Sequence, residues 1–486
     1  MDITPFLNRD LDIPLYQQLY RHFKENMHQG RIPKGLKLPS KRLLSSQLSI
    51  SQTTVERAYE QLAAEGYIVS KPRSGWFADY DSDAVYVKKP GASPVQTKAK
   101  EDRQWIDFHY GTVDAAHFPF SAWRKSMVAS LDQYGHELYR SGDDLGELEL
   151  RTLISEYLYQ SRGVNCRPEQ VIVGAGNPAL LQMLCKIFES NLSIGYEDPG
   201  YPRAREIFKA NHMKIIPIPV DDEGVCIRKL NEERPRLVYV TPSHQFTLGT
   251  IMPVNRRIQL LKWAKEHQSF IIEDDYDGEF RYTGQPIPSL QGLDQHHRVI
   301  YMGTFSQSLL PSLRISYMIL PLPLIEKGRE IASLYKQTVS CHSQLTLAQF
   351  IKSGEWQKHI NRMRKLYRKK RAVLLEAVRR ELGQYVRIRG ENSGLRILLD
   401  VQLPFSEKEL IEKAEEQGVK IYPVSLTYQK QVPEKTVSLG FAGVSETDIQ
   451  EGIKKSESRL GAVKGSSQLE ILKLESGMQS QQQNDL

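Results

Sequence analysis

The chain has 486 residues, more than one hydrophobic core usually supports, so at least two domains are expected. Hydrophobic residues make up 40% and charged residues 25%, the ordinary balance of a water-soluble globular protein. A net charge of +7 is compatible with a polyanionic partner, but it is spread over a long chain and does not identify nucleic acid.

Cysteine spacing and hydropathy exclude several classes of protein. The four cysteines, Cys166, Cys185, Cys226 and Cys341, form no C-x-x-C pair. This spacing argues against a zinc site or a disulfide framework and fits a reducing cytoplasm, so no metal site is predicted. The opening residues MDITPFLNRD lack the pattern of a signal peptide, and no apolar run approaches the roughly 18 residues that span a bilayer. We expect a cytoplasmic protein without a membrane partner.

Composition divides the chain into four segments. Residues 12–78 have the pattern of three short helices followed by a hairpin. Residues 79–104 are poor in large apolar groups and typical of a linker. In residues 105–462, helical patterns alternate with short β-branched runs, which predicts an α/β domain with a mostly parallel sheet. Residues 463–486 are polar and rich in Gln and Ser, so we predict a disordered tail.

Apolar periodicity and capping residues predict the helices of the first segment. Large apolar groups recur every fourth residue at Leu15, Leu19, Phe23 and Met27. Ser40 can cap a second helix, KRLLSSQL, and Ser51 a third, QTTVERAYEQLAAEG.

The third helix has two faces. Its inward residues are Val55, Tyr59 and Leu62, and its exposed N-terminal residues are Gln52, Thr53, Thr54 and Arg57. A recognition helix presents such short polar groups to base edges in the major groove. The hairpin that follows turns through Lys71-Pro72-Arg73-Ser74-Gly75, a basic tip that can approach a phosphate backbone. The alternative is a three-helix packing module whose Thr and Arg side chains are merely solvated.

Two motifs in the large segment are candidate ligand-binding groups, a glycine-flanked helix start and an acidic cluster. Gly174-Ala175-Gly176-Asn177 follows a β-branched run, and Pro178 begins a helix that Asn177 can cap. A glycine-flanked helix N-terminus offers free N–H groups to a phosphate, although many such turns are only structural. Glu273-Asp274-Asp275-Tyr276 follows another run, and such an acidic cluster can also simply solvate a strand end.

The first segment resembles the winged helix of the GntR family over LPSKRLLSSQLSISQTTVERAYEQLAAEGYIVSKPRSGWF. The resemblance implies that Arg42 and Arg57 contact DNA, with Ser40, Ser51, Thr53 and Gly75 supporting the docking. The predicted DNA-binding residues are Ser40, Arg42, Ser51, Gln52, Thr53, Thr54, Arg57, Lys71, Arg73 and Gly75.

The large segment resembles fold-type I, pyridoxal-phosphate-dependent aminotransferases through motifs such as EDPGYPRAR, IIEDDYDGEF and YMGTFSQSLLPSLRISY. Head, linker and body together resemble the MocR subfamily of GntR regulators. The implied fold is multidomain: a small α/β winged helix-turn-helix head and a large α/β transferase-like body. Members of this subfamily form head-to-tail dimers, so the resemblance implies a homodimer.

The same resemblance implies a cofactor site. Thr304 and Arg314 would complete the phosphate site, Asp274 would pair with the pyridinium nitrogen, and Tyr276 would lie near the phenolic oxygen. The predicted cofactor-binding residues are Gly174, Ala175, Gly176, Asn177, Tyr201, Asp274, Tyr276, Thr304 and Arg314.

The chain departs from the family pattern where the chemistry is centred. Gln307 stands where the family carries the Schiff-base lysine, and an amide nitrogen is not nucleophilic. A GABA-responsive member of the subfamily carries an arginine in the motif GFAR, where this chain has Gly443. Natural loss of the lysine is favoured over an engineered or sequencing change because both positions differ. The predicted ligand-pocket residues are Arg203, Gln307 and Gly443, and pyridoxal phosphate is expected to bind non-covalently or not at all.

Three functions fit these observations. The favoured one is a dimeric regulator that binds a double-stranded DNA operator and senses a small-molecule effector, an amino acid or a pyridoxal-phosphate-type ligand, through a catalytically inactive body. The second is an aminotransferase that carries a DNA-binding head. The third is an interaction protein whose body binds neither cofactor nor amino acid.

Overall fold

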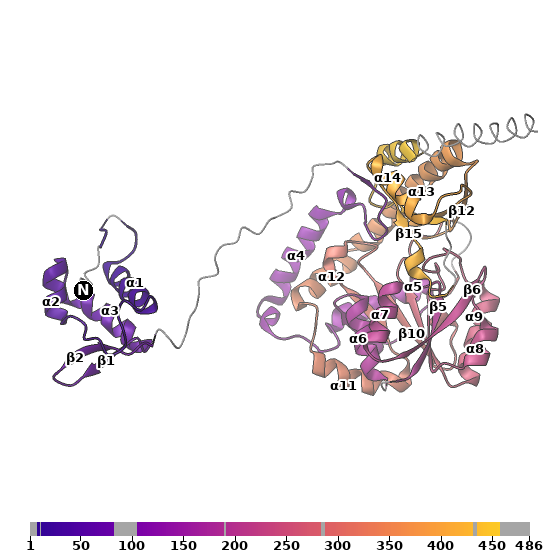
Figure 1. Cartoon of the computed structure of the whole chain (residues 1–486). Helices are drawn as coiled ribbons and strands as arrows, with labels where there is room; N and C mark the ends of the chain where they lie inside the picture. Colours follow the sequence, from indigo (N-terminus) through magenta and orange to yellow (C-terminus); the bar gives the residue numbers. More distant parts are fainter. Residues whose placement is uncertain are drawn as a thin grey trace, which may run out of the picture. The chain divides into compact units, whose positions relative to one another are not determined.

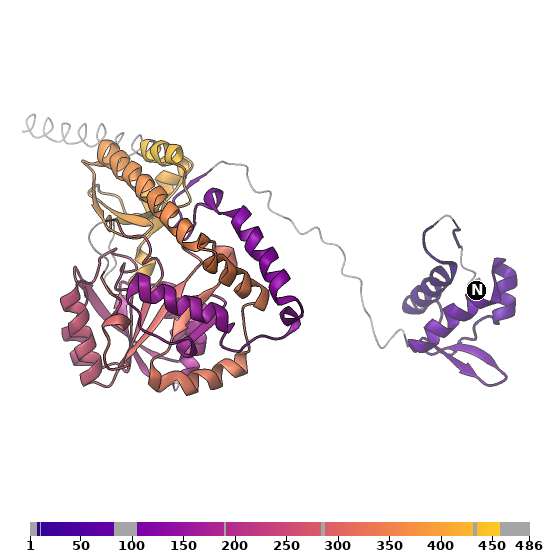
Figure 2. The ribbon, with the colours of Figure 1, turned by 180° about the vertical axis from the view of Figure 1, so that it is seen from behind.

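The computed structural model describes residues 7–9, 11–81, 105–188, 191–282, 287–430 and 435–456. The chain divides into two compact units, Met1–Asp102 and Arg103–Leu486 (Figures 1 and 2). Most of the predicted linker, and the whole predicted tail at 463–486, lie outside the described residues.

The first unit is built from three helices and a hairpin. The helices are α1 (Leu15–His28), α2 (Lys41–Leu48) and α3 (Gln52–Ala64), and the antiparallel strands are β1 (Ile68–Lys71) and β2 (Gly75–Ala78). The predicted periodicity is confirmed, because Leu19, Phe23, Met27, Val55, Tyr59 and Leu62 are all fully buried in one core. The wing turn is shorter than predicted, since Lys71 and Gly75 pair with each other as strand residues.

The centre of the second unit is an eight-stranded sheet in the order β4-β11-β10-β9-β8-β5-β6-β7. Its strands are β4 (Val171–Gly174), β5 (Ser193–Asp198), β6 (Lys214–Asp221), β7 (Gly224–Val225), β8 (Leu237–Val240), β9 (Phe270–Asp275), β10 (Val299–Thr304) and β11 (Ser316–Ile319). The run from β10 to β6 is parallel, which confirms the prediction of a mostly parallel sheet. Strand β11 is antiparallel because the connection from β10 contains no crossover helix.

Helices cover both faces of this sheet. One layer contains α6 (Asn177–Ile187), α7 (Pro202–Ala210) and α11 (Ile325–Tyr335), and the other contains α4 (Phe120–Tyr134), α5 (Leu148–Arg162), α8 (Ile227–Glu233), α9 (Val254–Glu266), α10 (Leu290–Leu293) and α12 (Cys341–Lys352). Alternate strand residues serve the two layers: Ile172 packs in one core while Val171 and Val173 pack in the other. Within the second layer, α8 and α9 lie at the end near β6, and α4 and α12 lie at the other end (Figure 1).

The C-terminal part of the body forms a smaller α/β layer. Helices α13 (Glu355–Ala377) and α14 (Glu407–Glu416) accompany an antiparallel sheet of β12 (Val386–Arg389), β13 (Arg396–Val401), β16 (Thr436–Gly440) and β15 (Tyr422–Pro423). Strand β3 (Ile106–Asp107) pairs with β14 (Val419–Lys420), which attaches the beginning of the body to this layer. Short 3₁₀ or π turns occupy Ala115–His117, Gly135–Tyr139, Pro168–Gln170, Pro311–Leu313, Leu322–Leu324, Val378–Leu382 and Ser425–Thr427.

Within the described ranges, no helix combines the length and apolarity needed to cross a bilayer. Nor do the described histidines, cysteines and carboxylates gather into a group of three that could hold a metal ion.

Candidate functional site

Two serine caps fix the helix-turn-helix of the head. Ser40 Oγ accepts a hydrogen bond from the backbone N–H of Leu43 at 3.2 Å, and Ser51 Oγ accepts one from Thr54 at 3.1 Å. Both predicted caps are confirmed. Between the helices, Ser49 adopts the left-handed conformation with φ 52°. This sharp turn lets α3 begin immediately after α2 with its first residues projecting from the surface.

The predicted DNA contacts lie on accessible surface. Nine of the ten are exposed, and only Thr54 is half-buried. Among the described residues, neither Arg42 nor Arg57 has a hydrogen-bond or ion-pair partner that would hold its guanidinium. Lys71 Nζ lies 4.7 Å from the ring centroid of Phe77, so its stem packs along the hairpin. Gly75 has φ 110°, a conformation in which glycine is favoured.

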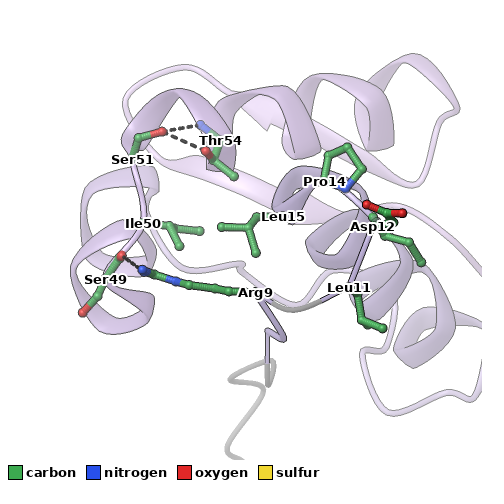
Figure 3. A pocket seen from close by; sticks show the side chains of 10 residues that line it. Arg9, Leu11, Asp12, Pro14, Leu15, Ser49, Ile50, Ser51 and Thr54 are labelled. Carbon is green, nitrogen blue, oxygen red and sulfur yellow. Dashed lines mark hydrogen bonds between the residues drawn. The ribbon is translucent and has the colours of Figure 1, made fainter.

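Sequence reasoning missed a further cation beside the tip of α3. Arg9 Nη2 donates a hydrogen bond to the carbonyl oxygen of Ser49 at 2.9 Å, and Arg9 lines an open groove with Ser51 and Thr54 (Figure 3). Arg9 precedes the predicted 12–78 boundary and belongs to no motif, so nothing in the local sequence indicated its position.

In the body, nine of the twelve predicted residues gather at a cavity of about 400 Å³. It lies where β8, β9 and β10 end, because the carboxyl ends of parallel strands meet at one edge of a sheet. Its lining includes Gly176, Asn177, Tyr201, Arg203, Asp274, Tyr276, Thr304, Gln307 and Arg314 from the predicted set. Lining residues that sequence reasoning did not assign to the site are His109, Tyr110, Gly111, Pro178, Tyr239, Thr241, Phe246, Ser306, Pro311 and Ser316.

One end of the cavity carries anion-binding groups. Gly176 has φ 88°, and a Cβ atom there would lie 2.5 Å from Arg314 Nη2, so a side chain would displace the guanidinium. Thr304 Oγ1 accepts hydrogen bonds from Ser306 N at 3.1 Å and Ser316 Oγ at 2.8 Å. Ser306 Oγ is buried without a partner. A guanidinium, hydroxyls and the N-terminus of α6 thus converge as a phosphate requires.

Asn177 differs from its predicted role as a helix cap. Gly176 occupies the cap position because its positive φ redirects the chain, and Asn177 is the first residue of α6. The Asn177 side chain instead donates from Nδ2 to Asp274 Oδ1 at 2.9 Å. Tyr239 donates its hydroxyl to the other oxygen of the same carboxylate.

Asp274 is a fully buried carboxyl at the end of β9. Burial raises its pKa to about 7, although the hydrogen bonds from Tyr239 and Asn177 act in the opposite direction. No described cation forms an ion pair with it. A cationic ring nitrogen placed there would stabilise the charged carboxylate.

Four aromatic rings that contact one another line the same cavity as this carboxyl. Tyr276 donates its hydroxyl to the carbonyl oxygen of His244 at 2.8 Å, and its ring centroid lies 5.8 Å from that of Phe246. The Phe246 ring centroid lies 4.6 Å from that of Tyr201 and 5.6 Å from that of Tyr110.

Gln307 lines the cavity, whereas three other predicted residues do not. Gln307 Oε1 is buried without a partner. Gly174 is the last residue of β4, and the backbone N–H of Ala175 donates to Thr338 Oγ1 at 3.0 Å. Gly443 lies against Thr112, whose Oγ1 would be 2.5 Å from an added Cβ atom. We therefore correct the assignment of Gly443 to the pocket: it follows β16 on a turn that is packed by the chain after β3.

The cavity residues fit pyridoxal phosphate. Arg314, Thr304 and Ser306 suit the phosphate, and Asp274 suits the ring nitrogen. The unpartnered buried atoms Ser306 Oγ, Asn177 Oδ1 and Gln307 Oε1 are polar groups for which a polar ligand would supply partners. Among the described residues that line the cavity there is no lysine.

Comparisons with known proteins define the class of the chain. Residues 103–455 match the aminotransferase class I and II family, and residues 15–78 match the bacterial regulatory proteins of the gntR family. The protein is therefore a winged helix-turn-helix head fused to an aminotransferase-like body of fold type I.

Relatives with the same two parts assign the family. The chain is 82% identical over 456 residues to the HTH-type transcriptional regulator YdeL of Bacillus subtilis, covering 94% of this chain and 98% of the relative. It is 34% identical over 481 residues to the probable rhizopine catabolism regulatory protein MocR of Rhizobium meliloti, covering 96% and 97%. The chain belongs to the MocR-type transcriptional regulators of the GntR family.

The body also resembles solved aminotransferases. The structure of Pyrococcus horikoshii kynurenine aminotransferase superimposes with a TM-score of 0.68 at 27% identity, over 74% of this chain and 92% of that one. This similarity supports the fold of the body.

The buried Asp274 predicts a pH dependence of stability. Its pKa of about 7 in the folded chain compares with about 3.9 in an unfolded one. Between these values the folded state holds a proton that the unfolded state has released, so the free energy of unfolding falls as the pH rises from about 4 to about 7. Asp274→Asn removes this titrating proton. In urea unfolding between pH 5 and 8, we expect the free energy of unfolding of the variant to fall less than that of wild type, by at most about 3 kcal/mol.

Glu197 and Glu273, whose pKa values burial also raises to about 7, should preserve part of the fall in the variant. The matched control is Asp132→Asn on the exposed surface of α4, which should keep the wild-type slope. Equal slopes for Asp274→Asn and wild type would contradict a protonated Asp274.

Proposed function

We propose that the chain regulates transcription by binding double-stranded operator DNA through its head, while its body binds a small-molecule effector and does not catalyse amino transfer. The observation that carries the proposal is Gln307, an amide in a cavity that otherwise suits the cofactor of an aminotransferase. The names of the relatives as transcriptional regulators support the DNA-binding role. A chromosomal target would place the working protein in the cytoplasm.

The head has the groups for both parts of DNA recognition. The short side chains of Gln52 and Thr53 and the free guanidinium of Arg57 sit on the first two turns of α3, where they can reach base edges in the major groove. Arg42 and the wing residues Lys71 and Arg73 are exposed cations suited to phosphates, which position the head without reading sequence.

The body has the groups to bind and orient a cofactor. Pyridoxal phosphate supplies, when bound, an electron-withdrawing ring and an aldehyde. Arg314, Thr304 and Ser306 would hold the phosphate, and Asp274 would hold a proton on the ring nitrogen. Gln307 can donate and accept hydrogen bonds, but it can neither attack a carbonyl carbon nor carry a proton between substrate atoms at neutral pH. The site is thus suited to non-covalent binding.

A competing function is amino transfer by a protein that also carries a DNA-binding head. The retained Asp274, Thr304 and Arg314 favour it, as does the aminotransferase fold. The amide at 307 opposes it, because transamination needs an amine for attack and proton transfer at this position.

The domain plan that serves this function has a head at 12–78, a linker at 79–104 and a sensor body at 105–462. Two heads carried by a homodimer would bind paired operator half-sites. An effector can shift operator affinity only by binding one arrangement of the heads more tightly than another.

Replacing Arg57 tests the DNA interface. Arg57→Ala should weaken binding of the full chain to an operator fragment recovered by genome-wide footprinting by about 1–3 kcal/mol, roughly 5- to 150-fold in Kd, and relax sequence preference. Fluorescence anisotropy at fixed salt measures the change. Arg21→Ala, an exposed arginine of α1 outside the predicted contacts, removes the same charge and should bind within about twofold of wild type. Equal losses in both variants would remove Arg57 from the interface.

Restoring an amine tests the inactive cavity. In the presence of pyridoxal phosphate, Gln307→Lys should become covalently labelled after borohydride reduction, and peptide mapping should place the label at residue 307. The matched control Gln357→Lys puts a lysine on the exposed surface of α13 and should gain no stoichiometric label. An unlabelled Gln307→Lys that remains folded would show that the cavity does not accept the cofactor.

Sedimentation tests the oligomeric state. The purified full chain should sediment as a dimer at micromolar concentration, near twice the 55.8 kDa chain mass. A monomer at this concentration would contradict the arrangement of two heads on paired half-sites.

A further inference from the structure

Arg396 is a buried cation that no described carboxylate neutralises. It is 5% exposed, and its Nε and Nη2 atoms have no hydrogen-bond partner. Other buried arginines of the body are paired: Arg151 lies 2.7 Å from Asp143, and Arg257 lies 3.6 Å from Glu273. Because an unpaired buried charge is unfavourable, the position of Arg396 calls for an anion that the described chain does not supply.

Arg396 adjoins the cavity of the body. Its guanidinium carbon lies 4.3 Å from the ring centroid of Phe246 and 4.6 Å from that of Tyr110, and both rings line the cavity. A guanidinium that packs against aromatic rings keeps its N–H donors in its own plane, where they remain available at the edge. The N–H groups of Arg396 that lack partners, on Nε and Nη2, lie at this edge of the guanidinium.

The register of the small sheet sets this position. Arg396 opens β13 directly opposite Gly440 of β16. A Cβ atom at Gly440 would lie 2.7 Å from the carbonyl oxygen of His109, so only glycine lets the chain before Tyr110 pass this close. The backbone N–H of Gly440 donates to the carbonyl oxygen of Phe108 at 2.8 Å. These contacts bring the Tyr110 ring to the guanidinium.

A second unpartnered polar group lies on the same face of the sheet. Ser438 stands two residues before Gly440, and paired residues of antiparallel strands point to the same side. Ser438 is buried, and its Oγ has no partner. Tyr422, which pairs with Ser438, packs its ring 4.9 Å from that of His109 in the cavity lining. Arg396 and Ser438 therefore lie on the same side of the sheet. Neither is itself a lining residue, but Arg396 contacts Tyr110 and Phe246, which line the cavity.

We infer that Arg396, supported by Ser438, binds the carboxylate of the effector. The ligand class is a small molecule that bears both an amino group and a carboxylate and that occupies the cavity with the cofactor. The inference rests on the proposed function, since it requires the cavity to accept pyridoxal phosphate. An edge-on guanidinium and a neighbouring hydroxyl match the two oxygens of a carboxylate. The arginine comes from β13, a position to which no sequence motif assigned a role.

Stable cofactor conjugates test the inference with the full chain. The probes are N-(5′-phosphopyridoxyl)-L-leucine and its decarboxylated counterpart, N-(5′-phosphopyridoxyl)-3-methylbutylamine. A second pair, the β-alanine and ethylamine conjugates, moves the carboxylate one carbon further from the nitrogen. In calorimetric titrations of wild type, at least one carboxylate probe should bind ten or more times tighter than its partner. Arg396→Met should reduce that ratio below about threefold and leave the affinity for the amine probe unchanged.

Matched variants separate charge from packing. Arg387→Met, on the exposed face of the neighbouring strand β12, should keep the wild-type ratio. Arg396→Lys keeps the charge but loses the planar pair of donors, so its affinity ratio should fall between those of wild type and Arg396→Met. If Arg396→Met does not fold, the ratio of Arg396→Lys tests the inference instead. Ratios near one for both probe pairs in wild type would overturn the inference while leaving cofactor binding intact. If no conjugate binds, the proposed cofactor site fails, and the inference fails with it.

Discussion

The proposed function of the body depends on the side chain at residue 307. An amide at residue 307 cannot attack a carbonyl carbon, yet around it the guanidinium of Arg314, the hydroxyls of Thr304 and Ser306, and the buried carboxyl of Asp274 all remain. Such a cavity can bind a phosphorylated ring ligand with favourable free energy and leave it chemically unchanged. Binding free energy that differs between two conformations shifts the balance between them, which is what a sensor requires.

Both functional surfaces depend on how backbone elements end. The cavity forms at the carboxyl ends of β8, β9 and β10, where side chains leave the sheet together and α6 begins. The tip of α3 is exposed because Ser51 satisfies the free N–H of Thr54 and a left-handed residue turns the chain just before it. In each place the local backbone positions polar groups, while the cores of alternating apolar residues keep the surrounding elements rigid.

Local patterns predicted much of this structure because they have local causes. The burial of Leu19, Phe23 and Met27 at four-residue spacing and the two serine caps depend on neighbours within one helix turn, and they were confirmed. Leu15, the first residue of the predicted repeat, is only half-buried. The parallel sheet followed from the alternation of strands with helices. The motif resemblance assigned Tyr201, Asp274 and Arg314, which are far apart in sequence, to one site, and all three line the cavity.

Features with long-range causes were missed. Gly443 seemed a pocket residue from its motif, but the turn after β16 packs it against Thr112. Asn177 bonds to Asp274 rather than capping its helix because the preceding glycine takes the cap position. The role of Arg396 depends on its cross-strand register with Gly440, which no residue near it in the sequence reveals.

Amino-group exchange is the most direct test of a body that binds without catalysing. The wild-type chain, saturated with pyridoxal phosphate, would be incubated with an isotopically labelled amino acid and a set of oxo acids, and transfer of the amino group would be followed by mass spectrometry. The amide at residue 307 predicts exchange no faster than free pyridoxal phosphate gives alone. Sustained turnover by the unaltered chain would contradict this account.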